Sequence, residues 1–526
     1  MPVPASATAR LLAGGIEGPR ALRPMLDTVL DALATGAADR GGPLPPGGPR
    51  AVARRVRAVA EPVLPTVGTG AHQALHTLVR ALSDPGEVEA GPHAAWHGTS
   101  LRCRSRPSRP TTRAILRLAM HRTRRRGNPP LLPRGRLAAG AAGAADPHCT
   151  AHLHCPPLAV AAAADLAASA LNPSLDSWDQ APAAGELETL TCRALARLVH
   201  PHRPDPDALA TTGGTEANQL ALLLAREAAR TAGVTAPLRI VCGANAHHSV
   251  HRAAWLLNLP APLTIPTPSG VLDPARLHDT LAELPGPPHP VLVVATAGTT
   301  DTGAIDPLTR IADLCDRHAA TLHIDAAYGG PLLFSDTLRT RLHGLDRART
   351  TALDLHKLGW QPAAAGLLAV PDSAVLAPLA HRADYLNAHD DTAAGLPDLL
   401  GRSLRTTRRP DILKIAVTLR ALGRRGLGDL VERACAAAQH LADLIDSRPG
   451  LDLYARPAIS TVLFRPTGAD PAAVAAVRRR LLREGRAVLG RATTCEGLWL
   501  KATVLNPHTQ TSDLRALVAL VEGSTP

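Results

Sequence analysis

Four short apolar segments in the middle of the chain constrain its fold more than any other feature. They cover residues 238–242, 291–296, 321–325 and 351–355. Helical or loop-like connections separate them, and this alternation is typical of a mainly parallel sheet with helices on both faces. Ligands of such sheets bind beyond the carboxyl ends of the strands. We therefore expect an α/β protein whose functional residues directly follow these segments.

Two of the segments end beside groups with a recognisable chemistry. Asp325 ends the third segment, and His356 and Lys357 follow the fourth. A buried carboxylate is costly unless it meets a positive partner, and a lysine in a partly buried site can act as an amine nucleophile. Pyridoxal 5'-phosphate (PLP) needs such a pair, because a lysine holds its aldehyde as a Schiff base and an aspartate keeps its pyridine nitrogen protonated. The pattern predicts a PLP site; the alternative for Lys357 is an exposed residue after a strand.

Lysine usage favours a special role for Lys357. The 526-residue chain contains three lysines, Lys357, Lys414 and Lys501, beside 54 arginines. Arginine supplies positive charge but cannot form a Schiff base. A lysine in a chain that otherwise uses arginine for its positive charges therefore indicates amine chemistry.

A glycine turn precedes the four segments. Gly213, Gly214 and Thr215 open a predicted helix that runs to about residue 232. Paired glycines let backbone amides approach an anion, and the N-terminus of a helix favours negative charge. The turn is compatible with phosphate binding, and an ordinary helix cap has the same pattern.

The net charge of +12 is concentrated in one part of the chain. Residues 102–136 contain twelve arginines and no acidic residue, and the rest has 45 Lys and Arg against 45 Asp and Glu. A nucleic-acid enzyme would spread its basic residues over a folded face with stacking aromatics. The charge therefore does not favour nucleic-acid binding, although a basic nucleic-acid-binding protein is the alternative from another class of function.

The pattern along the chain predicts four regions. Residues 1–83 form a helical N-terminal segment, 84–145 a basic, mobile insertion, 146–400 a large PLP-binding domain and 401–526 a small C-terminal α/β domain. We expect a cytoplasmic protein that does not enter a membrane, because no apolar run is long enough and no signal region begins the chain. The cysteines and histidines of residues 148–155 match no zinc spacing, so no metal is expected.

The motifs, in this order, resemble the PLP-dependent group II amino-acid decarboxylases. Within that family they look like the bacterial L-2,4-diaminobutyrate decarboxylases and the siderophore-pathway lysine decarboxylases, through residues 152–156 (HLHCP), 176–180 (DSWDQ) and 406–409 (TTRR). The resemblance implies the PLP-dependent transferase fold type I. It also implies a homodimer with the active site at the subunit interface.

The resemblance assigns a role to each matching residue. It implies that Lys357 is the Schiff-base lysine, that Asp325 pairs with the pyridinium nitrogen, and that Tyr385 on a mobile loop protonates the substrate carbon after carbon dioxide leaves. The remaining cofactor contacts are Ala327 and His247 on the two faces of the ring, Gly213, Gly214 and Thr215 at the phosphate, Thr300 near the cofactor, and His356 beside the lysine.

We expect decarboxylation of an L-diamino acid, either 2,4-diaminobutyrate or lysine. The chain has two Phe and three Tyr, so a pocket that stacks an aromatic substrate is less favoured. Asp176 and Asp179 could meet the distal ammonium of a diamino acid, or could cap local structure instead. The alternatives are a decarboxylase of an aromatic or acidic amino acid and an inactive homologue.

Overall fold

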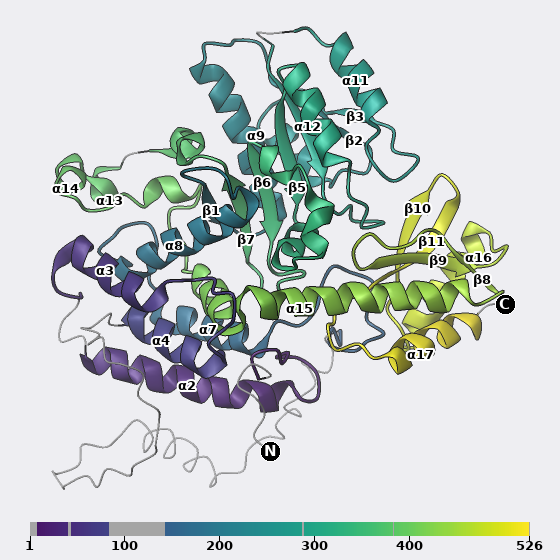
Figure 1. Cartoon of the computed structure of the whole chain (residues 1–526), viewed down its shortest axis with the longest axis horizontal. Coiled ribbons are helices and arrows are strands. Elements are labelled where there is room, and N and C mark those ends of the chain that lie inside the picture. Colours follow the sequence, from purple (N-terminus) through teal and green to yellow (C-terminus); the bar gives the residue numbers. More distant parts are fainter. Residues whose placement is uncertain (1–7, 40–43, 84–141, 287–288, 382, 525–526) are drawn as a thin grey trace, which may run out of the picture. The chain divides into compact units, whose positions relative to one another are not determined.

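The computed structural model describes residues 8–39, 44–83, 142–286, 289–381 and 383–524 (Figure 1). Most of the predicted basic insertion, with all twelve arginines of residues 102–136, lies outside these ranges. Within them, no helix combines the length and the apolar character that a membrane crossing requires. The domain boundaries at residues 83, 145 and 400 remain predictions.

A seven-stranded sheet forms the centre of the fold, in the order β1-β7-β6-β5-β4-β2-β3. The strands β2 to β6 run parallel to one another, whereas β7 is antiparallel to both of its neighbours, β1 and β6. The bounds are β1 (Asp207–Thr211), β2 (Arg239–Gly243), β3 (Leu263–Ile265), β4 (Val291–Thr296), β5 (Thr321–Ala326), β6 (Thr350–Asp354) and β7 (Gly366–Val370). The predicted mainly parallel sheet is confirmed, and its four predicted segments are β2, β4, β5 and β6.

Apolar clusters cover both faces of the sheet. Successive residues of a strand point to opposite faces, so neighbouring residues of one strand belong to different clusters. In β4, Leu292 and Val294 pack in an apolar cluster with α10 (Ser249–Leu256). Val293 and Ala295 instead join the cluster that includes α12 (Leu308–Arg317). The other helices around the sheet are α8 (Pro182–Val199), α9 (Gly214–Thr231) and α11 (Pro274–Glu283). The prediction of helices on both faces is therefore confirmed.

The N-terminal region is helical, as predicted. Its helices are α2 (Gly18–Asp39), α3 (Gly48–Ala60) and α4 (Ala71–Ser83). In α2 the buried residues Met25, Val29 and Ala32 recur at spacings of four and three, which places them on one face of the helix. That helix packs along α4 and α7 (Ala159–Leu171), and α4 in turn packs on α15 (Ile412–Asp446).

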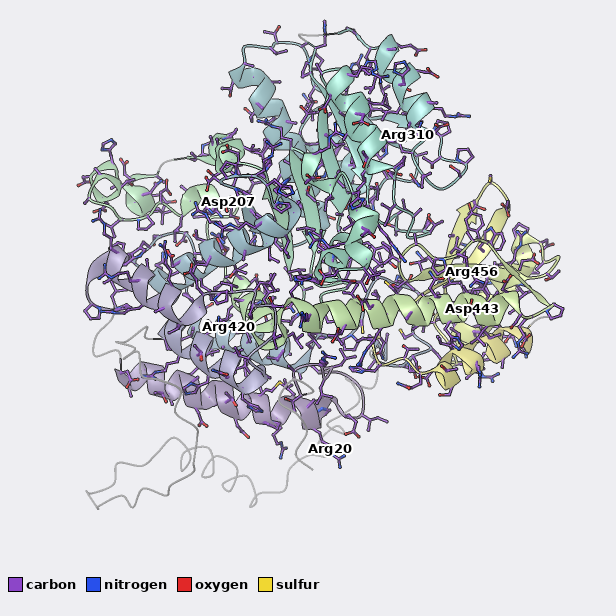
Figure 2. The ribbon with its side chains drawn as sticks, in the orientation of Figure 1. Arg20, Asp207, Arg310, Arg420, Asp443 and Arg456 are labelled. Atoms are coloured by element: carbon purple, nitrogen blue, oxygen red, sulfur yellow. The ribbon has the colours of Figure 1, made fainter. Side chains whose placement is uncertain are left out.

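The C-terminal part has a second sheet with its own apolar core. The sheet is antiparallel, in the order β10-β11-β9-β8. Its elements are β8 (Leu451–Leu453), β9 (Thr461–Pro466), α16 (Pro471–Arg483), β10 (Gly490–Thr494), β11 (Gly497–Thr503) and α17 (Thr511–Glu522). Figure 2 shows Arg456, which follows β8, beside Asp443 of α15, with which it forms an ion pair.

The long helix α15 is interrupted at Gly423. Gly423 has a φ of 66°, outside the helical region, so the helix axis breaks there. A Cβ at this position would lie 2.6 Å from the backbone nitrogen of Gly68. Glycine is required because the loop that follows α3 passes directly against the helix.

Shorter helical turns complete the fold. Two of them, α13 (Asp384–Asn387) and α14 (His389–Ala393), lie between β7 and α15. The 3-10 segments are Gly330–Phe334, Leu338–Leu342, Leu345–Arg347, Ser373–Leu379 and Leu400–Arg402.

Candidate active site

Nine of the ten predicted site residues line one cavity of about 400 Å³ at the carboxyl ends of the parallel strands. This is the edge at which α/β sheets bind ligands. The nine are Gly213, Gly214, Thr215, His247, Thr300, Asp325, Ala327, His356 and Lys357. The sequence analysis assigned no site role to the other lining residues, which are Leu153, Thr212, Thr296, Gly298, Tyr328 and Asp354.

The amine of Lys357 meets a buried carboxylate. Its Nζ lies 2.9 Å from Oδ2 of Asp354, the last residue of β6. His356 Nε2 lies 3.4 Å from the same oxygen, and burial lowers the pKa of His356 below its usual value, opposed in part by Asp354. Asp354 is therefore the counter-charge of the lysine, and among the described residues its Oδ1 has no hydrogen-bond partner. A clue was present in the sequence, because this aspartate lies next to the end of a predicted strand.

Asp325 lies near the carboxyl end of β5 and is held by two donors. Asn218 donates its side-chain amide to Oδ2 over 2.8 Å, and the backbone N–H of Ala327 donates to Oδ1 over 3.1 Å. The carboxylate is buried, with 5% of the residue exposed. These donors stabilise the charged form that a pyridinium partner needs.

His247 reaches the cavity from the loop between β2 and α10. Its Nδ1 lies 2.8 Å from Oγ of Ser249. Burial lowers the pKa of His247 below its usual value, and the nearby charge of Asp325 opposes this shift. The neighbouring His248 does not line the cavity.

The glycine turn lies at the start of α9, under the cavity. A Cβ on Gly213 would lie 3.0 Å from Cε1 of His356, and one on Gly214 would lie 2.8 Å from Cβ of Ala327. Side chains at these positions would fill the space in front of the helix N-terminus. The first turn of a helix presents N–H groups that have no partner within the helix, so the turn suits an anion such as a phosphate.

Tyr385 is the predicted site residue that the structure does not bring to the cavity. It lies on α13 and is 83% exposed. Asp176 and Asp179 do not line the cavity either. Asp176 is buried and accepts a hydrogen bond from the Gln180 side chain over 2.8 Å, which matches the structural alternative.

The lining residues fit PLP. An amine, a buried carboxylate on another strand and a glycine turn at a helix N-terminus match its aldehyde, its ring nitrogen and its phosphate. The cavity has the size of a small-molecule site. No group of three or more His, Cys, Asp or Glu that could hold a metal occurs within the described ranges. Fold and site together define a PLP-dependent enzyme of fold type I.

Comparison with known proteins identifies the family. The model of the pyridoxal-dependent decarboxylase conserved domain matches residues 133–467. An L-2,4-diaminobutyrate decarboxylase of Rhizobium meliloti (strain 1021) is 41% identical over 376 residues, which cover 69% of this chain and 74% of that protein. An L-2,4-diaminobutyrate decarboxylase of Acinetobacter baumannii is 32% identical over 404 residues, or 71% and 79% of the two chains.

A solved structure supports the same family assignment. It is the glutamate decarboxylase domain of diaminobutyrate-pyruvate transaminase and L-2,4-diaminobutyrate decarboxylase from Vibrio parahaemolyticus, with a TM-score of 0.64, 27% identity and 99% of both chains covered. The chain belongs to the pyridoxal-dependent decarboxylase family. It is a PLP-dependent amino-acid decarboxylase, as expected, and the roles of its individual residues remain predictions.

Proposed function

We propose that this enzyme decarboxylates an L-diamino acid, 2,4-diaminobutyrate before lysine, and releases the amine and carbon dioxide. The observation that carries the substrate class is the 41% identity to a protein named for 2,4-diaminobutyrate. The lining of the cavity supports a small substrate. Among the described lining residues, Tyr328 is the one with a benzene ring, and its hydroxyl lies within 2.9 Å of both Ser460 and Thr461 Oγ atoms, so it is tied to the protein.

Each charged group has a task in this proposal. Bound PLP supplies an electron sink for the pair of electrons that carbon dioxide leaves behind. Lys357 would hold the cofactor through its amine, and Asp354 would stabilise the ammonium of Lys357 whenever that amine is free. Asp325 would keep a proton on the ring nitrogen, and His247 would contact the ring from its loop.

Tyr385 is proposed to return the proton to the substrate carbon. The loop that carries it is internally held, because Asn387 donates to the carbonyl of His381 over 3.1 Å and to Asp398 over 2.8 Å. The exposed tyrosine can reach a cavity in a homodimer whose active site lies at the subunit interface. A homodimer and a cytoplasmic location are parts of this proposal. Light scattering during gel filtration and cell fractionation test them.

Carbon dioxide release tests the reaction and the substrate. The protein with PLP is offered 2,4-diaminobutyrate, lysine, ornithine, glutamate, aspartate, tyrosine and tryptophan in parallel. We expect release from 2,4-diaminobutyrate above all others and none from Lys357→Ala, since that variant lacks the amine. Arg20→Ala, on the exposed surface of α2, serves as the matched control.

The panel also decides between the alternatives. Turnover of glutamate, aspartate, tyrosine or tryptophan in place of the diamino acids would contradict the proposed substrate class. Retention of PLP without any carbon dioxide release would point to an inactive homologue.

A further inference from the structure

One buried amide links the two groups that face the cofactor from different elements. Asn218 lies on α9 and is fully buried. Its Nδ2 lies 2.8 Å from Oδ2 of Asp325 on β5 and 2.8 Å from Oγ of Ser249 on α10. Its Oδ1 lies 2.9 Å from Nε2 of His323, also on β5. The side chain therefore meets a partner at each of its polar atoms.

The partners fix the direction of the amide. The atom that faces the Asp325 carboxylate must donate, so it is the nitrogen, and the oxygen faces His323. Burial lowers the pKa of His323 to about 4, so its ring is neutral near pH 7. Its Nε2 carries the proton, because it donates to the amide oxygen. Its Nδ1 can then accept from the Thr350 hydroxyl at 2.9 Å, and the Thr350 carbonyl oxygen lies 3.0 Å from the same nitrogen.

The same amide determines how His247 is held. Ser249 Oγ accepts one hydrogen from Asn218 and can donate its own proton to Nδ1 of His247, 2.8 Å away. The backbone N–H of Ser249 points to the same nitrogen over 3.3 Å. A neutral His247 therefore carries its proton on Nε2. The network runs without a break from Thr350 through His323, Asn218 and Ser249 to His247, with a branch to Asp325.

We infer that Asn218 is a positioning residue that sets the orientation of both Asp325 and His247 toward the cofactor. The inference rests on the proposed function. Loss of the amide frees the Asp325 carboxylate to turn and to lose its contact with the ring nitrogen, and it also loosens the imidazole. An amide that served stability alone would not alter the protonation of the cofactor ring.

The experiment compares the wild-type protein with Asn218→Leu, Asn218→Asp and Ser249→Ala, all as full chains with PLP. The leucine side chain has a similar volume but no donor. We expect kcat of Asn218→Leu to fall about tenfold with little change in KM, because a hydrogen bond to a charged group is lost. The nitrogen NMR signal of ring-labelled PLP should shift toward the unprotonated form. Ser249→Ala removes one acceptor of Asn218 but leaves the hydrogen bond from Asn218 to Asp325. It should therefore keep that signal and release PLP about threefold faster, because His247 loses its hydroxyl partner.

Asn218→Asp provides a readout that a structural role would not move. At high pH its carboxylate repels Asp325, whereas a protonated carboxyl can donate to it, so its kcat relative to wild type should recover as the pH falls. The same ratio for Asn218→Leu should stay flat. The titratable groups around the amide are Asp325 and His323 on β5, His247 before α10, and Asp354 and Lys357 at the end of β6. All of them are present in every variant, and the ratio to wild type removes their own contribution.

The outcomes separate this inference from the proposed function. Failure of the wild-type protein to retain PLP or to release carbon dioxide would overturn the proposed function. An active wild type with an equally active Asn218→Leu, or a loss in Asn218→Asp that does not change with pH, would overturn the role of Asn218. Circular dichroism identifies a variant that does not fold, and the other two variants then decide.

Discussion

At the scale of single residues, the cavity contains charges that balance one another at short range. Lys357 and Asp354 lie 2.9 Å apart, and Asp354 is nearly fully buried. Removing one partner of a buried pair leaves the other charge uncompensated, which costs more than the pair contributes. The balance must also change when PLP binds, because the lysine then loses its free ammonium.

Asp354→Asn should therefore lower the thermal midpoint of the cofactor-free protein more than that of the PLP-loaded protein. We expect the free energy of unfolding of the cofactor-free protein to fall by about 1–2 kcal/mol. The loss is no larger because Lys357 keeps some contact with water. In a Lys357→Met background the same substitution should stabilise, because Asp354 is then the uncompensated charge. Thermal unfolding of the four proteins measures this double-mutant cycle. Equal losses in both backgrounds would show that the two side chains do not interact.

The stability of the protein should fall as the pH decreases from about 6.5 to about 4, partly because of His323. Burial lowers its pKa to about 4, so between these values the unfolded chain binds a proton that the native protein does not. Stability thus rises with pH in this window and is lost on acidification, by about 1.4 kcal/mol per pH unit for one histidine. Thermal midpoints between pH 4 and 7 test this. His323→Gln should flatten the slope, because it removes the ring whose pKa burial lowers.

At the scale of elements, a buried ion pair fixes the segment that enters α15. Arg408 Nη2 donates to Oε1 of Glu188 on α8 over 2.7 Å, and Nη1 donates to Oε2 over 2.5 Å. Both side chains are less than 5% exposed. The segment follows the loop that carries Tyr385, so the pair anchors one end of that loop to the helices beside the sheet.

Arg408→Met should destabilise the protein by about 3 kcal/mol or more, because it leaves the Glu188 carboxylate buried without a partner. Adding Glu188→Leu should recover most of the loss, since two apolar side chains can fill the same space. Arg480→Met is the control, because its pair with Glu484 lies on the surface and such pairs contribute little. Thermal midpoints measure all of these variants, and a double variant no more stable than Arg408→Met would contradict the argument.

At the scale of the whole molecule, the sequence predicted the elements whose local pattern agrees with their environment. The strands β2, β4, β5 and β6 are rich in Val, Ile, Leu or Thr and end next to turns or polar residues, so they could be recognised. The strands β1, with two alanines in five residues, and β3, with three residues, were missed because their local signal is weak. The antiparallel direction of β7 depends on the path of the chain and has no local signature.

The site residues likewise divide into those that the sequence could predict and those that it could not. Lys357, Asp325 and the glycine turn were recognisable because each lies at, or within two residues of, the end or start of a predicted element. Asn218 could not be found from spacing, because its role depends on contacts to residues 31 and 107 positions away. Such contacts exist only when α9 is packed against the sheet. The position of Tyr385 outside the cavity likewise depends on how an exposed loop is placed.

The exposure of Tyr385 leads to a prediction about the assembly. If Tyr385 of one subunit serves the cavity of the other, a mixed dimer of Lys357→Ala and Tyr385→Phe chains has one complete site. Random re-association of equal amounts gives half mixed dimers, each with one intact site of two, so about a quarter of the wild-type activity should return. We expect this recovery after the two inactive proteins are unfolded and refolded together, measured as carbon dioxide release.

Refolding each variant alone is the control, and neither should regain activity. If Tyr385 instead serves the cavity of its own chain, every site in the mixed dimer lacks either Lys357 or Tyr385, and no activity returns. Light scattering must show a dimer in the refolded mixture, because a monomer would contradict the shared site directly. Recovery would place the proton donor and the Schiff-base lysine on different subunits and would make dimer formation a condition for catalysis.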